Sequence, residues 1–141
     1  MKNKNKALTV YKASAGSGKT FTLAVEFIKL LIIDPKRYEN ILAVTFTNKA
    51  TEEMKHRIVS QLFGISKGLK SSDSYLNKIS SELDYTKELV RERAGIALYN
   101  LLHNYNRFRI QTIDAFFQSV LRNMVKELGL GINMRISLQD S

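Results

Sequence analysis

Apolar residues recur along this chain at two spacings, one typical of helices and one typical of buried strands. The helical spacing predicts a helix over residues 19–33 that is apolar around most of its circumference, so we expect it to be buried on several sides. Asp34 and Pro35 end it, because proline cannot continue the helical hydrogen bonds. A second helix begins after Thr47 or Asn48, either of which can cap it. Its apolar stripe recurs at every fourth residue: Ala50, Met54, Ile58 and Leu62.

Three more helices are predicted farther along the chain: residues 75–83, 84–104 and 114–128. Residues 64–74 precede them and are rich in Gly, Ser and Lys, so we expect them to form the most mobile internal loop. Asp114 is expected to cap the last helix. Phe117 is expected in the core, because it shares one helical face with other apolar residues: Val120, Leu121, Met124 and Leu128.

Four short segments are predicted to form strands: residues 8–11, 41–46, 108–113 and 132–138. Residues 41–46 are almost continuously apolar, which is typical of a strand covered on both faces of a parallel sheet. A glycine-containing loop and a helix separate the first two strands, and another helix follows, which is the order of a βαβ unit. The sequence therefore predicts an α/β fold in which helices pack on a parallel sheet.

The charge of the chain favours a polyanionic partner. Its 141 residues suit one domain or part of one, and 22 Lys and Arg against 13 Asp and Glu give a net charge of +9. Nucleic acid is favoured over a membrane, because no apolar stretch is long enough to span a bilayer. The basic residues are spread along the chain, so the charge is weaker evidence than a motif. The lack of cysteine excludes disulfides and thiolate chemistry, and with no signal peptide recognised we expect a cytoplasmic protein.

A phosphate-binding loop is predicted at residues 13–20, ASAGSGKT, which fit G-x-x-x-x-G-K-[ST] except that Ala13 replaces the first glycine. The loop lies between a predicted strand and a predicted helix, where small residues let backbone amides surround a phosphate. Lys19 would contact the β- and γ-phosphates, and the Thr20 hydroxyl would bind Mg²⁺. The alternative is a small-residue turn before a helix. The residues expected to bind ATP are Ala15, Gly16, Ser17, Gly18, Lys19, Thr20 and Phe21.

An acid that holds Mg²⁺ and polarises water is not evident in the sequence. Asp34 continues the predicted helix over residues 19–33, so we expect it to end that helix in solvent. Asp114 lies at a strand end, but a role as helix cap explains it adequately. The chain is therefore expected to bind ATP and Mg²⁺ without hydrolysing ATP competently on its own.

Three segments resemble motifs of superfamily 1 DNA helicases. Residues 13–20 resemble motif I, residues 44–58, VTFTNKATEEMKHRI, resemble motif Ia, and residues 112–122, TIDAFFQSVLR, resemble the following motif. Helicases of the UvrD/Rep type carry a glutamine upstream of motif I, whereas no glutamine precedes Gln61 here. The chain is therefore more similar to the RecB/AddA helicase–nuclease branch.

This resemblance implies that residues 1–141 form the N-terminal part of a RecA-like, P-loop ATP-binding domain, incomplete at its C-terminus, with a helical insertion over about residues 65–105. It implies an ATP-dependent DNA helicase or exonuclease in which Lys19 and Thr20 are catalytic. The remaining helicase domains, or a partner nuclease subunit, would complete the site, and the chain would be a truncated product or half of a split gene. The residues that would face single-stranded DNA are Phe46, Thr47, Asn48, Lys49, Thr112, Asp114 and Phe116.

Structural roles compete with several of these assignments. Phe46 could instead be a core aromatic that finishes a buried strand. His56 and His103 lack partner ligands in register and are interpreted as surface or packing residues. At the level of function, the alternatives are another P-loop enzyme such as a kinase, and a remnant that binds nucleotide or DNA without catalysis.

Overall fold

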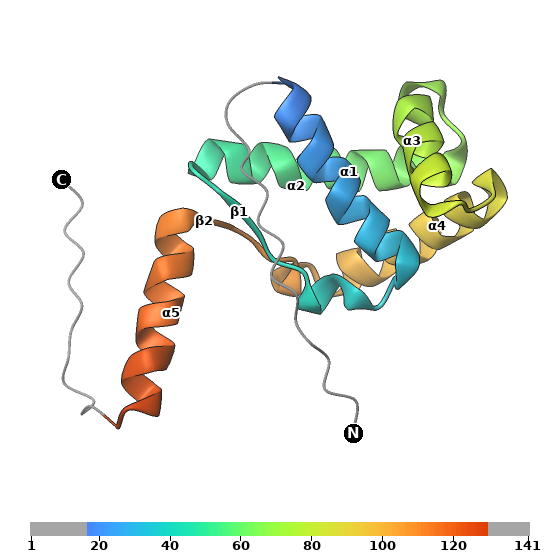
Figure 1. Ribbon diagram of the computed structural model, residues 1–141. Coiled ribbons are helices and arrows are strands. Elements are labelled where there is room, and N and C mark those ends of the chain that lie inside the picture. Colours follow the sequence, from blue (N-terminus) through green and yellow to red (C-terminus); the bar gives the residue numbers. More distant parts are fainter. Residues whose placement is uncertain (1–16, 130–141) are drawn as a thin grey trace.

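The computed structural model describes residues 17–129, which form a mostly helical α/β structure with one small sheet (Figure 1). Two strands and five helices alternate in this part of the chain: α1 (Ser17–Ile33), β1 (Ala43–Thr45), α2 (Asn48–Lys67), α3 (Asp73–Leu83), α4 (Lys87–His103), β2 (Ile110–Thr112) and α5 (Ile113–Glu127). Three short 3-10 turns connect them: η1 (Arg37–Asn40), η2 (Lys70–Ser72) and η3 (Tyr105–Arg107).

The sheet consists of β1 and β2, which pair in parallel with Ala43 opposite Ile110 and Thr45 opposite Thr112. This confirms the two internal strands predicted at residues 41–46 and 108–113, although each is only three residues long. The predicted strands at residues 8–11 and 132–138 lie outside the described residues. The observed α/β class is therefore that of a two-stranded parallel sheet packed with helices.

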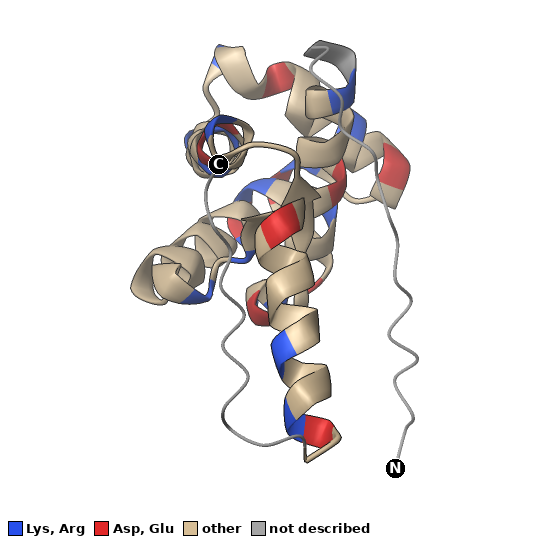
Figure 2. Ribbon diagram, turned by 90° about the vertical axis from the view of Figure 1, so that its left-hand side faces the viewer, with Lys and Arg blue, Asp and Glu red and all other residues tan. Residues whose placement is uncertain are grey.

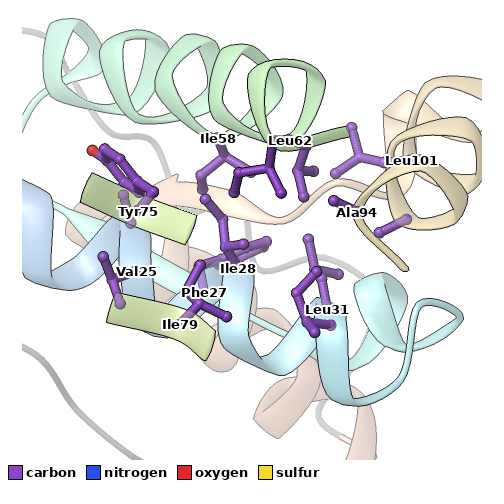
Figure 3. Close-up of a cluster of buried hydrophobic side chains, with 14 of the residues drawn as sticks. Val25, Phe27, Ile28, Leu31, Ile58, Leu62, Tyr75, Ile79, Ala94 and Leu101 are labelled. Carbon is purple, nitrogen blue, oxygen red and sulfur yellow. The ribbon is translucent and has the colours of Figure 1, made fainter. Parts of the chain in front are cut away.

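Helix α1 lies at the centre of the hydrophobic core, between α2, α3 and α4 (Figure 3). Its side chains meet Ile58 and Leu62 of α2 and Ala94 and Leu101 of α4 in one cluster. The Phe27 ring also lies 5.5 Å from the ring of Phe108, in an edge-to-face contact that joins the helical core to the start of β2. The expectation that this helix is buried on several sides is confirmed.

The C-terminus of α1 is stabilised by α4. The helix ends at Ile33, as predicted, and Asp34 is exposed. Helix ends leave their last carbonyl groups without helical partners. Here the Arg93 guanidinium donates to the carbonyl oxygens of Ile32 and Ile33 at 3.0 and 2.8 Å, and the Asn100 amide donates to the carbonyl oxygen of Pro35 at 3.2 Å. A positive charge at this position also complements the helix dipole.

The prediction of a mobile loop over residues 64–74 is wrong. Helix α2 continues to Lys67 and ends at Gly68, which adopts the left-handed conformation (φ 69°). Turn η2 then folds back onto α2, so that Ser72 is buried and contacts the helix at Gly64. The small side chains that suggested flexibility in fact permit this close approach of two backbone segments.

Helix α5 projects from the end of β2, away from the helical core (Figure 1). None of its residues is buried, and the Phe117 side chain is 56% exposed, so the prediction of Phe117 in the core is wrong. The apolar stripe predicted from the sequence is present, but among the described residues no element covers it. Asp114 is not the cap either: the Thr112 hydroxyl accepts the hydrogen bond from the Ala115 amide at 3.2 Å.

Candidate nucleotide and nucleic-acid site

The predicted phosphate-binding residues lie at the start of α1, as far as the structure describes them. Ser17 and Gly18 form the beginning of the helix, Lys19 is exposed, and Thr20 is partly buried. Ala15 and Gly16 lie outside the described residues. No acidic residue occupies the first turn of α1, so the positive end of its dipole is not neutralised by the helix itself. That arrangement favours an anion at the helix start.

Phe21 is packed against the helical segment that follows α2. Its ring lies 4.6 Å from the Tyr75 ring in an edge-to-face contact, and the Tyr75 hydroxyl accepts a hydrogen bond from Arg57 at 3.4 Å. These contacts tie the first turn of α1 to both α2 and α3. They give Phe21 a packing role, and its contact with nucleotide stays a prediction.

The described residues suit a magnesium ion only in part. Mg²⁺ prefers oxygen ligands, and in nucleotide sites it takes several of them from phosphates and water. The Thr20 hydroxyl fits one such ligand. Within residues 17–129 no group of three or more His, Cys, Asp and Glu could hold a metal ion. His56 and His103 are both exposed, which confirms their interpretation as surface residues.

A second group of predicted site residues lies where β1 ends and α2 begins. Phe46 is 60% exposed, so the alternative of a core aromatic is excluded. Thr47 caps α2, because its hydroxyl accepts a hydrogen bond from the Ala50 amide at 3.0 Å. Asn48 and Lys49 are exposed in the first turn of the helix. The strand thus delivers an exposed aromatic ring beside a lysine and a helix N-terminus.

The third group lies where β2 ends and α5 begins. Thr112 caps α5, Asp114 is exposed in the first turn, and Phe116 is partly buried. The Phe116 ring lies 6.2 Å from that of Phe117. Asp114 is therefore free of the capping role that the sequence suggested for it.

Strand pairing brings the second and third groups together. Because Thr45 pairs with Thr112, Phe46 and the start of α5 follow directly at the same edge of the sheet. The carboxyl ends of parallel strands are where ligands bind in open α/β sheets. Lys19 belongs to another element, and the structure shows no hydrogen bond or ion pair between it and either strand end within the described residues.

The sequence analysis missed two buried polar residues beneath this edge. The Thr45 and Thr51 side chains are only 4% and 7% exposed, and their hydroxyl oxygens lie 2.6 Å apart. Strand threonines are common, so Thr45 alone gives no warning. The useful sign is the spacing of Thr45, Thr47 and Thr51, which places three hydroxyls at one strand-to-helix junction.

Charge is distributed rather than concentrated around the strand ends. Figure 2 shows lysine and arginine over several elements, with acidic residues between them. Near the start of α2, the Lys55 ammonium lies 5.8 Å from the centre of the Tyr105 ring. Burial, together with the negative charge of Glu52, raises the pKa of Tyr105 above its ordinary value. No helix within the described residues has both the length and the apolar character needed to cross a membrane.

Comparison with known proteins places this arrangement in a family. Residues 1–141 match the family described as UvrD/REP helicase N-terminal domain. The chain is 32% identical over 126 residues to the RecBCD enzyme subunit RecB of Buchnera aphidicola subsp. Acyrthosiphon pisum, which covers 82% of this chain and 10% of that protein. It is 30% identical over 129 residues to an ATP-dependent helicase/nuclease of Bacillus pumilus, covering 90% of this chain and 9% of that protein.

A shorter alignment of 56 residues is 52% identical to DNA helicase II of Salmonella typhimurium and covers 40% of this chain and 8% of that protein. The chain spans about a tenth of the length of the curated relatives it matches. No solved structure shows a significant match. The RecB and ATP-dependent helicase/nuclease relatives confirm the resemblance to the RecB/AddA branch. The chain belongs to the UvrD/REP helicase N-terminal domain family.

Proposed function

We propose that this chain is the ATP-binding segment of an ATP-dependent DNA helicase or exonuclease of the RecB/AddA type. In this proposal it binds ATP and Mg²⁺ at the start of α1 and single-stranded DNA at the ends of β1 and β2. The observation that carries the proposal is the pairing of Thr45 with Thr112, which sets two helicase-like segments side by side with Phe46 exposed between them.

The strand ends offer the two kinds of contact that single-stranded DNA needs. An exposed aromatic ring can stack on a base, which is worth about 1–3 kcal/mol per base. A positively charged groove or helix start can hold the backbone. The first turn of α2 has no acidic residue and carries Lys49, whereas the first turn of α5 carries Asp114. A phosphate is therefore expected on the α2 side, with Asp114 accepting a hydrogen bond from a base edge.

The start of α1 offers the contacts that a nucleoside triphosphate needs. Lys19 supplies a positive charge for the terminal phosphates beside a helix N-terminus without acidic residues. Bound Mg²⁺ would neutralise phosphate charge, and the Thr20 hydroxyl would hold it from the protein side. Since the described residues contain no acidic cluster for the metal, we expect hydrolysis to require residues of further helicase domains or a partner subunit.

A fluorescent ATP analogue tests the nucleotide part of the proposal. Removing the Lys19 ammonium by Lys19→Ala should weaken binding of the analogue at least tenfold, because a charge-assisted contact to phosphate is lost. Lys67→Ala is the matched control, since Lys67 is also exposed but lies at the far end of α2. Equal affinities of the parent and the Lys19→Ala protein would contradict a phosphate-binding role.

A fluorescein-labelled oligo(dT) tests the DNA part. Binding should weaken steeply as salt rises, because basic side chains release counterions from the phosphates. Phe46→Ala should weaken binding roughly tenfold. Phe63→Ala is the control, because Phe63 is 47% exposed on the same helix that follows Phe46. Equal losses in both variants would contradict a specific site at the strand ends.

The alternative functions make different predictions in these assays. A P-loop kinase would lose nucleotide in Lys19→Ala but would show no effect of Phe46→Ala on DNA. A non-catalytic remnant would bind both ligands and never hydrolyse ATP, even with the remaining helicase domains supplied. No structural observation within the described residues favours the kinase.

A further inference from the structure

The two buried threonines at the end of β1 form a hydrogen-bonded unit that spans three elements. Thr45 belongs to β1 and Thr51 to the first turns of α2, and their hydroxyl oxygens lie 2.6 Å apart. The Thr45 hydroxyl also lies 3.4 Å from the Gln111 carbonyl oxygen of β2. Buried hydroxyls are costly unless they are hydrogen-bonded, so this unit exists only while the three elements keep their present arrangement.

The carbonyl oxygen of Thr47 is the shared acceptor of this unit. It lies 3.2 Å from the Thr45 hydroxyl, 3.1 Å from the Thr51 hydroxyl and 3.0 Å from the Thr51 amide. Each hydroxyl has one hydrogen, so the two threonines share these acceptors rather than filling all of them at once. Every such arrangement joins the end of β1 to α2 or β2.

Phe46 lies between the two residues that this unit holds. On one side Thr45 is fixed by strand pairing and by its buried hydroxyl. On the other side Thr47 is fixed through its carbonyl oxygen and through its cap on α2. The Phe46 side chain nevertheless remains 60% exposed, so burial of its own ring does not hold it in place.

We infer that Thr45 and Thr51 are positioning residues that keep Phe46 presented to a DNA base. This inference rests on the proposed function and adds residues that do not themselves touch DNA. A ring whose backbone is fixed before binding loses less conformational freedom when a base stacks on it. Without the hydroxyl unit, the Phe46 segment can sample conformations in which the ring covers neighbouring apolar surface instead of facing solvent.

The hydroxyl of Thr51 can be removed without a large change in shape. Thr51→Val should weaken oligo(dT) binding roughly fivefold, because coupling between contacting residues is of this size. Thr51→Ser keeps the hydroxyl and should remain within about twofold of the parent. Binding of the ATP analogue, which depends on α1, should be unchanged in both variants. A parallel series, Thr45→Val and Thr45→Ser, gives the same comparison should Thr51→Val fail to fold.

A double variant separates positioning from a general structural effect. If Thr51 acts through the Phe46 ring, Phe46→Ala combined with Thr51→Val should bind oligo(dT) no more weakly than Phe46→Ala alone. Additive losses, failure of the serine variants to restore binding, or an equal loss of ATP-analogue binding would each overturn the inference. Loss with Phe46→Ala but none with either valine variant would overturn the inference and leave the proposed function standing. No effect of Phe46→Ala itself would overturn the proposed function.

Discussion

Helices α1 and α5 both carry a strong apolar pattern, but they meet different surroundings. In α1 the buried residues are Leu23, Ala24, Val25, Phe27, Ile28, Leu31 and Ile32. In α5 no residue is buried. Three helices pack around α1, whereas α5 contacts the two strands near its start. A sequence pattern thus identifies the apolar face of a helix, but burial depends on whether another element lies against that face.

The uncovered face of α5 is extensive. Its exposed apolar residues are Phe117, Val120, Leu121, Met124 and Leu128. Because apolar side chains stabilise a fold only when they leave water, this face contributes little to the stability of the described residues. The cost of a substitution should therefore follow the covering of the site rather than the hydrophobicity of the residue.

The largest expected effect separates the two helices directly. Ile28 is fully buried in α1, so Ile28→Ala should lower the free energy of unfolding by about 2–5 kcal/mol through lost burial and a cavity. Leu121 is 45% exposed on α5, and Leu121→Ala should change it by less than about 0.5 kcal/mol. Chemical denaturation of both variants measures the difference. Similar losses would show that α5 is covered and that the comparison is wrong.

Two glycines extend the comparison to backbone packing. A Cβ atom added at Gly64 would lie 3.0 Å from the Ser72 Cβ, so Gly64→Ala should destabilise the fold by about 1–3 kcal/mol. At Gly95 the added atom would lie 3.7 Å from the Ser66 Cβ, which is an ordinary contact. Gly95→Ala should therefore stabilise α4 by about 0.5–1 kcal/mol. Thermal melting should show opposite shifts, and shifts of the same sign would contradict the packing described here.

The smallest effect concerns the polar edge of α1. The Lys29 ammonium lies 2.7 Å from a Glu82 carboxylate oxygen and 3.2 Å from one of Glu26. These hydrogen bonds lower the pKa of Glu82 and raise the pKa of Lys29. The lowered carboxyl pKa stabilises the fold above its ordinary value and the raised ammonium pKa stabilises it below its ordinary value, which places the window between roughly pH 4 and pH 10.

Lys29→Met keeps the apolar stem and removes the charge. The variant should be less stable than the parent by no more than about 1 kcal/mol at neutral pH. The difference should shrink as the pH falls to about 3, because Glu82 is then protonated in both proteins. Melting curves at the two pH values measure it. A difference that is unchanged at low pH would assign the effect to packing rather than to the ion pair.

The sequence was sufficient wherever the determinant is local. Pro35 ends α1, the hydroxyl of Thr47 caps α2, and the apolar run at residues 41–46 contains a parallel strand. It was insufficient where a distant segment decides. The turn around Ser72 orders residues predicted to be loose, and Arg93 caps a helix that lies 60 residues earlier in the chain.

The candidate site divides in the same way. Motif spacing identified Phe46 and Asp114, but only the pairing of β1 with β2 shows that their segments lie at one edge of the sheet. The exposure of Phe46 could not be derived either, because an aromatic residue after a buried strand is as compatible with a core as with a surface. The supporting role of Thr51 depends on a buried contact that no local pattern reports.

The most direct test of the central claim is to map where single-stranded DNA binds. Amide NMR spectra of the chain titrated with oligo(dT) should shift most at residues 46–49 and 112–116, the two strand ends that β1 and β2 bring together. Amides near Phe63 and along α4 should stay in place. Shifts concentrated on α4 or on the apolar face of α5, with the strand ends unchanged, would contradict a nucleic-acid site at the edge of the sheet.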